Sequence, residues 1–217
     1  MEGWTGMKNL AKAILAAVII VLFSAAGASA GPRARVPRTS KAPRATAAPR
    51  AAVPDDLNSK LVDAAGKGDT KAVNELIAKG ADVNGREATS SRSTPLIAAA
   101  CNAKVEVARI LVEHGAKVNS TNSENTSALN YASYIGNAEL VLLLVEHGAD
   151  INAVDGVGRT PLMWAAVQGN KDAVLVLLKH GADANLRDPD GVTALSMAES
   201  TGHKEVMQML STVGATK

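Results

Sequence analysis

The stretch DGVGRTPLMWAAVQGNKDAVLVLLKHGADAN, residues 155–185, decides the fold of this chain. A helix is predicted to start at Thr160-Pro161, because a threonine hydroxyl can accept hydrogen bonds from the free amides of the first turn and proline is tolerated at the first helical position. Gly169 is expected to end this helix in a left-handed conformation. A second helix is predicted over residues 172–179, where apolar side chains recur at helical spacing. Two such helices cannot bury both of their apolar sides alone, so the stretch predicts neighbours of the same kind.

The neighbours are visible as repeats along the chain. The sequence Gly-Ala-x-x-Asn recurs at residues 80–84, 115–119, 148–152 and 181–185, so successive copies lie 35, 33 and 33 residues apart. A fixed period of about 33 residues indicates a repeat protein. The leucine of the first helix recurs in step at Leu61, Leu96, Leu129, Leu162 and Leu195.

This pattern resembles the ankyrin-repeat family, in which each unit is a helix, a turn, a second helix and a glycine-ended loop. The resemblance covers about residues 57–213 and is carried also by Thr94-Pro95-Leu96 and by the alanine pairs at 64/65, 99/100 and 165/166. It implies an all-α solenoid of about five helix-turn-helix repeats joined by hairpin loops, in a domain at residues 55–217. The repeats are expected at residues 57–86, 89–121, 122–154, 155–187 and 188–213.

Several units depart from the pattern. The first has Ser59-Lys60 in place of Thr-Pro and is expected to expose charged residues on its outer side, as a terminal repeat does. The loop before Thr94 is two residues longer than its later counterparts. Ala103 stands where the sister units have glycine, and a left-handed alanine costs about 1 kcal/mol, so a strained turn is expected there. The fifth unit is expected to fray over residues 214–217.

The first 30 residues have the parts of an export signal. Two lysines precede an apolar run at residues 13–23, and Ala28-Ser29-Ala30 supplies the small residues of a cleavage site. We expect an exported chain of bacterial type, cleaved after Ala30 and periplasmic or secreted. An uncleaved signal that anchors the chain to the inner membrane is the alternative, although the run is short for a membrane span. A start of translation at Met1 and one at Met7 both fit the sequence.

Residues 31–54 are rich in proline, alanine and arginine and contain few large apolar side chains, so we expect a disordered linker. Charge is segregated along the chain: residues 1–54 carry eight Lys or Arg against one acid, whereas residues 55–217 carry fifteen against twenty. The linker could therefore make weak electrostatic contact with an anionic envelope surface, or serve only as a solvated spacer. Nucleic acid is not an expected partner of an exported chain.

The residues that could carry chemistry are explained by the repeat pattern. His114, His147 and His180 recur just before the loop glycines, and stacked repeats would hold them about 10 Å apart, too far to share a zinc ion. Cys101, the only cysteine, is interpreted as a small apolar filler, with a solvent-facing redox site as the alternative. Sequence motifs for catalysis or phosphate binding are not found in the repeats. We therefore predict a protein that is not an enzyme, with no cofactor and no metal site.

The resemblance assigns structural roles to three further residues. Asp155 and Asp188 stand seven residues before repeat leucines, where the family has an aspartate that bonds the local backbone of the hairpin. Trp164 stands where the family usually has a core leucine. The two aspartates are therefore expected to be turn residues and the tryptophan to have a packing role.

The resemblance also implies that the hairpin tips and the ends of the first helices line a concave face. Tyr134, Ile135 and Val167 are expected to form an exposed apolar patch at its centre, because aromatic and aliphatic groups surrounded by polar residues are the usual anchors of protein interfaces. The alternative is that these three residues pack under the hairpins and bind nothing. The candidate partner-binding residues are Tyr134, Ile135, Val167, Gln168, Cys101, Asn102, Ser91, Glu124, Val157 and Arg159.

These observations favour a monomeric, non-catalytic protein–protein interaction module, a scaffold or inhibitor that binds an unidentified protein on its concave face. One alternative is a protein that associates with the cell envelope through its basic linker. Another is a small enzyme or metal-binding module on a repeat scaffold, which would need a convergent polar pocket.

Overall fold

The computed structural model describes residues 55–216, so the predictions for residues 1–30 and 31–54 lie outside the described residues. Within that part, ten helices follow one another as five pairs, which confirms the predicted all-α repeat fold. The helices have 7 to 13 residues, and none in the described part is long and apolar enough to cross a membrane. The first helices of the pairs are α2 (Asp55–Lys67), α4 (Pro95–Cys101), α6 (Ala128–Ile135), α8 (Pro161–Val167) and α10 (Ala194–Thr201). The second helices are α3 (Thr70–Ala78), α5 (Val105–Glu113), α7 (Ala138–Glu146), α9 (Lys171–Lys179) and α11 (Lys204–Thr212).

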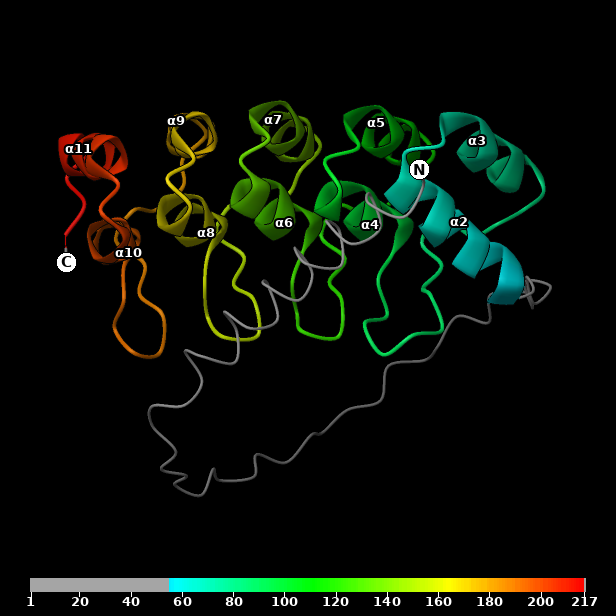
Figure 1. Cartoon of the computed structure of the whole chain (residues 1–217), viewed down its shortest axis with the longest axis horizontal. Coiled ribbons are helices and arrows are strands. Elements are labelled where there is room, and N and C mark those ends of the chain that lie inside the picture. Colours follow the sequence, from blue (N-terminus) through cyan, green and yellow to red (C-terminus); the bar gives the residue numbers. More distant parts are fainter. Residues whose placement is uncertain (1–54, 217) are drawn as a thin grey trace, which may run out of the picture. The chain divides into compact units, whose positions relative to one another are not determined.

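The pairs stack side by side in sequence order. Each first helix contacts the first helices of the adjacent pairs, and each second helix contacts its counterparts in the same way. Figure 1 shows the two resulting layers: the second helices α3, α5, α7, α9 and α11 lie above, and the loops between pairs project downward from the first-helix layer. Neighbouring pairs thus cover the apolar sides that a single pair leaves open.

The helix starts follow the predicted chemistry. The hydroxyl of Thr160 accepts a hydrogen bond from the amide of Met163 at 3.2 Å, and Pro161 occupies the first helical position. Thr94 caps α4 in the same manner, and Ser127 takes this role for α6. The first repeat is different, because α2 begins at Asp55, ahead of the Ser59-Lys60 that replaces Thr-Pro.

The turn after α4 confirms the strain predicted for it. Ala103 has a left-handed φ of 53°, whereas glycine serves at the equivalent positions, with φ of 81° at Gly136 and 69° at Gly169. An alanine in this conformation brings its Cβ too close to the following carbonyl oxygen. The second repeat therefore keeps the shared turn at a local cost.

The core is built from thin aliphatic side chains. The repeat leucines of the first helices are at most 6% exposed, and a second series of fully buried leucines comes from the second helices. Both alanines of each predicted pair are buried, which lets neighbouring first helices approach closely. The second series is Leu111, Leu144, Leu177 and Leu210.

The asparagine of each Gly-Ala-x-x-Asn sequence ties its repeat to the next one. The amide nitrogen of Asn84 donates to the carbonyl of Gly115 at 3.1 Å, and its Oδ1 accepts from the backbone amide of Lys117 at 2.7 Å. These directional bonds fix the relative position of stacked repeats, which apolar contact alone does not do. The corresponding bonds further along join Asn119 to Gly148 and Asp150, Asn152 to Asp183, and Asn185 to Thr216.

The first end of the stack uses a substitute for this bond, and the last end keeps the regular one. At the start, Asn58 of α2 accepts from the amide of Asp82 at 2.9 Å, although no complete repeat precedes it within the described part. At the other end, Gly214 is left-handed with φ of 78° and Ala215 donates to the carbonyl of Leu210 at 3.1 Å, as in the internal loops. The predicted fraying after residue 213 is therefore wrong as far as residue 216, because the last loop forms and is held by Asn185.

Candidate functional site

The candidate site is a surface that we call the hairpin face. It consists of the four loops between pairs, residues 79–94, 114–127, 147–160 and 180–193, together with the first helices that follow them, α4, α6, α8 and α10. The loops contribute the predicted residues Ser91, Glu124, Val157 and Arg159. The ends of α4, α6 and α8 contribute Cys101, Asn102, Tyr134, Ile135, Val167 and Gln168.

The predicted apolar patch is only partly open to solvent. Ile135 is 40% exposed and Val157, in the adjacent hairpin, is 50% exposed. Tyr134 and Val167 are half-buried. The open apolar area thus comes from Ile135 and Val157, while Tyr134 is held against a neighbour.

That neighbour is Trp164, which has the expected packing role but lies on the hairpin face and is not fully buried. The indole is half-buried and lies edge to face with the ring of Tyr134, with centroids 5.4 Å apart and planes at 84°. The guanidinium carbon of Arg159 lies 5.2 Å from the centroid of the same indole, within the range of a cation–π contact. Trp164 is therefore the centre of an aromatic cluster on the hairpin face.

Asp155 joins this cluster to the hairpin. Its Oδ1 accepts hydrogen bonds from the backbone amides of Val157 at 3.0 Å and Arg159 at 2.9 Å, which confirms the predicted turn role. Its Oδ2 accepts from Nε1 of Trp164 at 2.8 Å. One buried carboxylate thus orients both the loop and the ring. Asp188 bonds the amides of Asp190 and Val192 in the same way.

The third repeat has an equivalent pair with different chemistry. Oδ1 of Asn122 accepts from the backbone amides of Glu124 and Thr126, each at 2.9 Å. Its Nδ2 lies 3.2 Å from the hydroxyl oxygen of Tyr131, to which it donates. Tyr131 occupies the position in α6 that Trp164 occupies in α8, two residues after the repeat leucine. Two neighbouring repeats therefore present aromatic residues that their hairpins hold in place.

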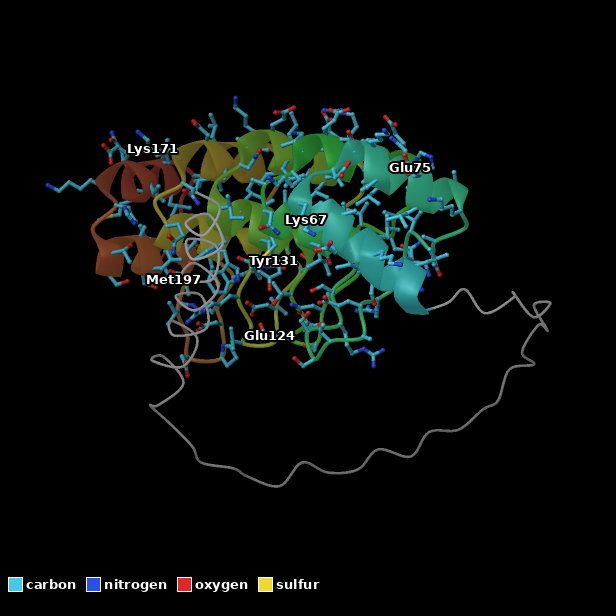
Figure 2. The ribbon with its side chains drawn as sticks, turned by 45° about the vertical axis from the view of Figure 1, so that its right-hand side comes forward. Lys67, Glu75, Glu124, Tyr131, Lys171 and Met197 are labelled. Atoms are coloured by element: carbon cyan, nitrogen blue, oxygen red, sulfur yellow. The ribbon has the colours of Figure 1, made fainter. Side chains whose placement is uncertain are left out.

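The hydroxyl of Tyr131 stays protonated at any physiological pH. Burial raises its pKa to about 12, and repulsion by Cys101, Glu124 and Asp155 acts in the same direction, against a smaller opposite effect of the Asn122 hydrogen bond. Figure 2 shows Tyr131 at the level of the first helices and Glu124 below it among the hairpins. Of the groups near Tyr131, the carboxylates of Glu124 and Asp155 carry negative charge at neutral pH.

Backbone hydrogen bonds join the tips of three hairpins into a row. The amide of Ser123 donates to the carbonyl of Ser91, and the amide of Gly156 donates to the carbonyl of Glu124, both at 2.9 Å. A Cβ at Gly156 would lie 2.6 Å from that carbonyl oxygen, so the close approach requires glycine. The next position in this series is Pro189, which has no N–H, and the row therefore ends at the fourth repeat.

The longer loop of the second repeat has its own support. Glu87 stands at the base of this loop, where its backbone amide donates to the carbonyl of Ser93 at 3.1 Å. Its carboxylate accepts from the Ser91 hydroxyl and from the amide of Ser93. Burial tends to raise the pKa of Glu87, but hydrogen bonds from Ser91, Thr89 and Ser93 outweigh it, so the pKa is lowered overall. Glutamate has a longer side chain than the Asn or Asp that supports the other hairpins, and it thus bonds across a loop that is two residues longer than theirs.

Cys101 departs from the predicted filler role, since it is exposed at the end of α4. Its thiol is nevertheless shielded enough that burial raises its pKa, which lowers the fraction of reactive thiolate. Asn102, beside it, bonds the carbonyl of Ala98 in its own helix at 2.9 Å. Gln168, at the end of α8, is exposed like Asn102.

The histidine column lies where the loops begin, at the ends of the second helices α5, α7 and α9. Nδ1 of His114 lies 2.8 Å from the carbonyl of Ile110, and Nδ1 of His147 lies 2.7 Å from that of Leu143. These are hydrogen bonds to the last turn of each helix, in keeping with the structural role inferred from the repeat pattern. No group of three or more His, Cys, Asp or Glu in residues 55–216 is arranged to hold a metal ion.

A depression of about 310 Å³ lies on the outer side of the first repeat, between α2 and α3. Its charged lining includes Asp63 and Lys67, which pair at 2.6 Å, and Glu75 (Figure 2). Lys60 and Asp63 are exposed, which confirms the predicted wet outer side of a terminal unit.

Sequence reasoning missed the two aromatic residues that organise the site. The sequence does contain a signal for them. The position two residues after the repeat leucine differs from repeat to repeat and is never leucine: it is Ala98, Tyr131, Trp164 or Met197. Each aromatic residue also follows an Asn or Asp by nine residues, which brings a hairpin side chain to its polar edge.

Comparison with protein families matches residues 61–155 and 153–217 to the family described as "Ankyrin repeats (3 copies)". A search of curated proteins finds no match to the sequence. The family match covers well over half of the chain and coincides with the stacked helix pairs and their hairpins. The chain therefore belongs to the ankyrin-repeat family.

Proposed function

We propose that this chain is an exported, non-catalytic scaffold or inhibitor that binds a protein partner on its hairpin face. Ankyrin repeats are typically protein–protein interaction modules and usually lack catalytic activity. The observation that carries the proposal is the cluster of Tyr134, Trp164 and Arg159, in which both rings remain partly exposed to solvent. Aromatic residues and arginine are the side chains enriched at the energetic centres of protein interfaces.

The surroundings of this cluster support the same function. The partly exposed Ile135 and Val157 add apolar area beside it, and Gln168 and Glu124 add polar groups. Hydrogen bonds between hairpin tips and from the Trp164 indole N–H to Asp155 hold the surface in one conformation. A preorganised surface loses little conformational entropy on binding, which favours affinity.

The test compares two exposed apolar residues on different layers. Ile135 on the hairpin face is 40% exposed, and Leu175 on α9 in the second-helix layer is 42% exposed. The partner is first identified by crosslinking and affinity purification from the native envelope, and its affinity for each variant is then measured. Ile135→Glu should weaken binding by at least about tenfold, or 1.4 kcal/mol, while Leu175→Glu should bind as the wild type does. Equal affinities for all three proteins would refute the proposal.

A second candidate function is association with an anionic envelope surface through the basic residues 31–54, which lie outside the described residues. The charge segregation between this segment and the acidic repeats favours it. Deletion of residues 31–54 separates the two functions, because binding of the protein partner should survive the deletion and sedimentation with anionic vesicles should not.

A further inference from the structure

The orientation of the Asn122 amide determines what Tyr131 can do. Both backbone amides that bond Asn122, those of Glu124 and Thr126, require an oxygen acceptor, so Oδ1 faces them and Nδ2 faces the tyrosine. An amide nitrogen cannot accept a hydrogen bond. The Tyr131 oxygen is therefore the acceptor in this pair, and its own hydrogen points elsewhere.

The neighbouring repeat has the opposite polarity. The N–H of Trp164 is its single donor, and the carboxylate of Asp155 already accepts it. For Tyr131, Asn122 is the only hydrogen-bond partner within residues 55–216. At this shared repeat position, the hydrogen-bond donor of Trp164 is therefore already bonded within the protein, whereas the O–H of Tyr131 can donate to another group.

The charges around Tyr131 restrict which groups of a partner can accept a hydrogen bond from its hydroxyl. Glu124 is exposed and forms no ion pair within the described residues, and Asp155 is a second nearby carboxylate. Arg159, a cation of the same cluster, is stacked on Trp164. An incoming carboxylate would be repelled, whereas a neutral main-chain carbonyl would not, and a cation beside that carbonyl would be attracted to Glu124.

We propose that Tyr131 is a specificity-determining residue whose hydroxyl donates a hydrogen bond to a main-chain carbonyl of an extended partner segment, next to a lysine or arginine that pairs with Glu124. The inference rests on the proposed function, since it names the kind of segment that the hairpin face takes. Asn122 is the positioning residue, because its amide makes the hydroxyl a donor to the partner.

The test uses two variants that remove the donor by different routes. Tyr131→Phe deletes the hydroxyl. Asn122→Asp keeps one oxygen for the hairpin amides and turns the second toward the phenol, which then donates to the carboxylate rather than to a partner. Ser123→Asp is the matched control, because it adds the same charge to the same hairpin at an exposed position without touching Tyr131.

The probe is a phage-displayed library of random dodecapeptides, selected on the full chain and followed by fluorescence anisotropy with the synthesised peptides. The wild type should select peptides rich in lysine or arginine. Tyr131→Phe and Asn122→Asp should each bind them roughly fivefold to tenfold more weakly, as expected for one lost hydrogen bond. Ser123→Asp should bind at least as tightly as the wild type. Charge alone predicts the opposite result for Asn122→Asp, because a new carboxylate would attract a basic peptide.

Two outcomes would overturn the inference. One is selection of no lysine- or arginine-containing peptides by the wild type. The other is unchanged affinity of these peptides for Tyr131→Phe and Asn122→Asp. In the second case, the peptide affinity of Ile135→Glu shows whether only the inference about Tyr131 fails or the proposed function fails too. If Ile135→Glu binds the peptides more weakly, the hairpin face remains the binding surface and only the role of Tyr131 is refuted. If its affinity is unchanged, the proposed function is refuted as well.

Discussion

The side-chain amide of Asn119 donates to the carbonyl of Gly148 at 2.9 Å, across the boundary between the second and third repeats. Its Oδ1 accepts from the backbone amide of Asp150 at 2.8 Å, so one side chain bonds two groups of the next loop. Asn84 makes both bonds at the preceding boundary, and the Oδ1 atoms of Asn152 and Asn185 accept the backbone bond at the two that follow. The recurring asparagine of the sequence is thus explained as the residue that joins neighbouring repeats.

Replacing Asn119 by alanine should destabilise the protein by about 1–2 kcal/mol, because it removes two hydrogen bonds between repeats. Asn74→Ala is the control, since Asn74 is also exposed but bonds only the carbonyl of Thr70 in its own helix. Urea unfolding followed by circular dichroism measures both. Equal losses for the two variants would show that the bond across the boundary has no special role.

Ala103→Gly should stabilise the protein by roughly 0.5–1 kcal/mol, because glycine adopts the left-handed conformation without the steric penalty of alanine. The reverse change at the equivalent site, Gly136→Ala, should destabilise it, since the new Cβ would lie 2.5 Å from the side chain of Asn170. Thermal unfolding compares the two. A loss of stability in Ala103→Gly would mean that the turn is not strained.

Glu87→Gln should lower stability at neutral pH but not in acid. The folded pKa of Glu87 is lowered, so the folded state binds a proton less readily than the unfolded chain. The contribution of the carboxylate is therefore complete above its ordinary pKa and is lost as the pH falls through the lowered folded value. Melting temperatures of both proteins between pH 7 and pH 3 test this. A difference that stays constant over this range would contradict it.

We propose further that the mature chain begins at residue 31. Mass spectrometry of the protein recovered from its native envelope should find cleavage after Ala30, and replacing Ala28 and Ala30 by bulky residues should retain the precursor. An intact N-terminus on the wild-type protein in membranes would favour the uncleaved anchor instead.

The fold could be predicted from the sequence because the same local signals for helices and turns occur in one repeat after another. Thr160-Pro161 starts a helix by its own chemistry, and the period of the leucines fixes which sides meet. Even the irregular Ala103 turn follows from comparing repeats within the chain. Local signals that are repeated in register therefore determine the architecture.

The site was less predictable because it depends on contacts between neighbouring repeats and on individual substitutions. The repeat pattern predicts only a packing role for Trp164, whereas its partners Asp155 and Tyr134 hold it on the hairpin face. The role of Asn122 depends on which way its amide turns, which two backbone donors decide. Such orientations cannot be obtained from spacing alone.

The most direct test of the hairpin face as the binding surface is site-specific photocrosslinking with benzoylphenylalanine. Val157 on this face and Val213 at the end of α11 are 50% and 52% exposed, so the probe is equally accessible at both sites. Irradiation in the native envelope should give one discrete adduct with a protein partner from position 157 and none from position 213. Adducts of the same size from both positions, or an adduct from position 213 alone, would contradict the account.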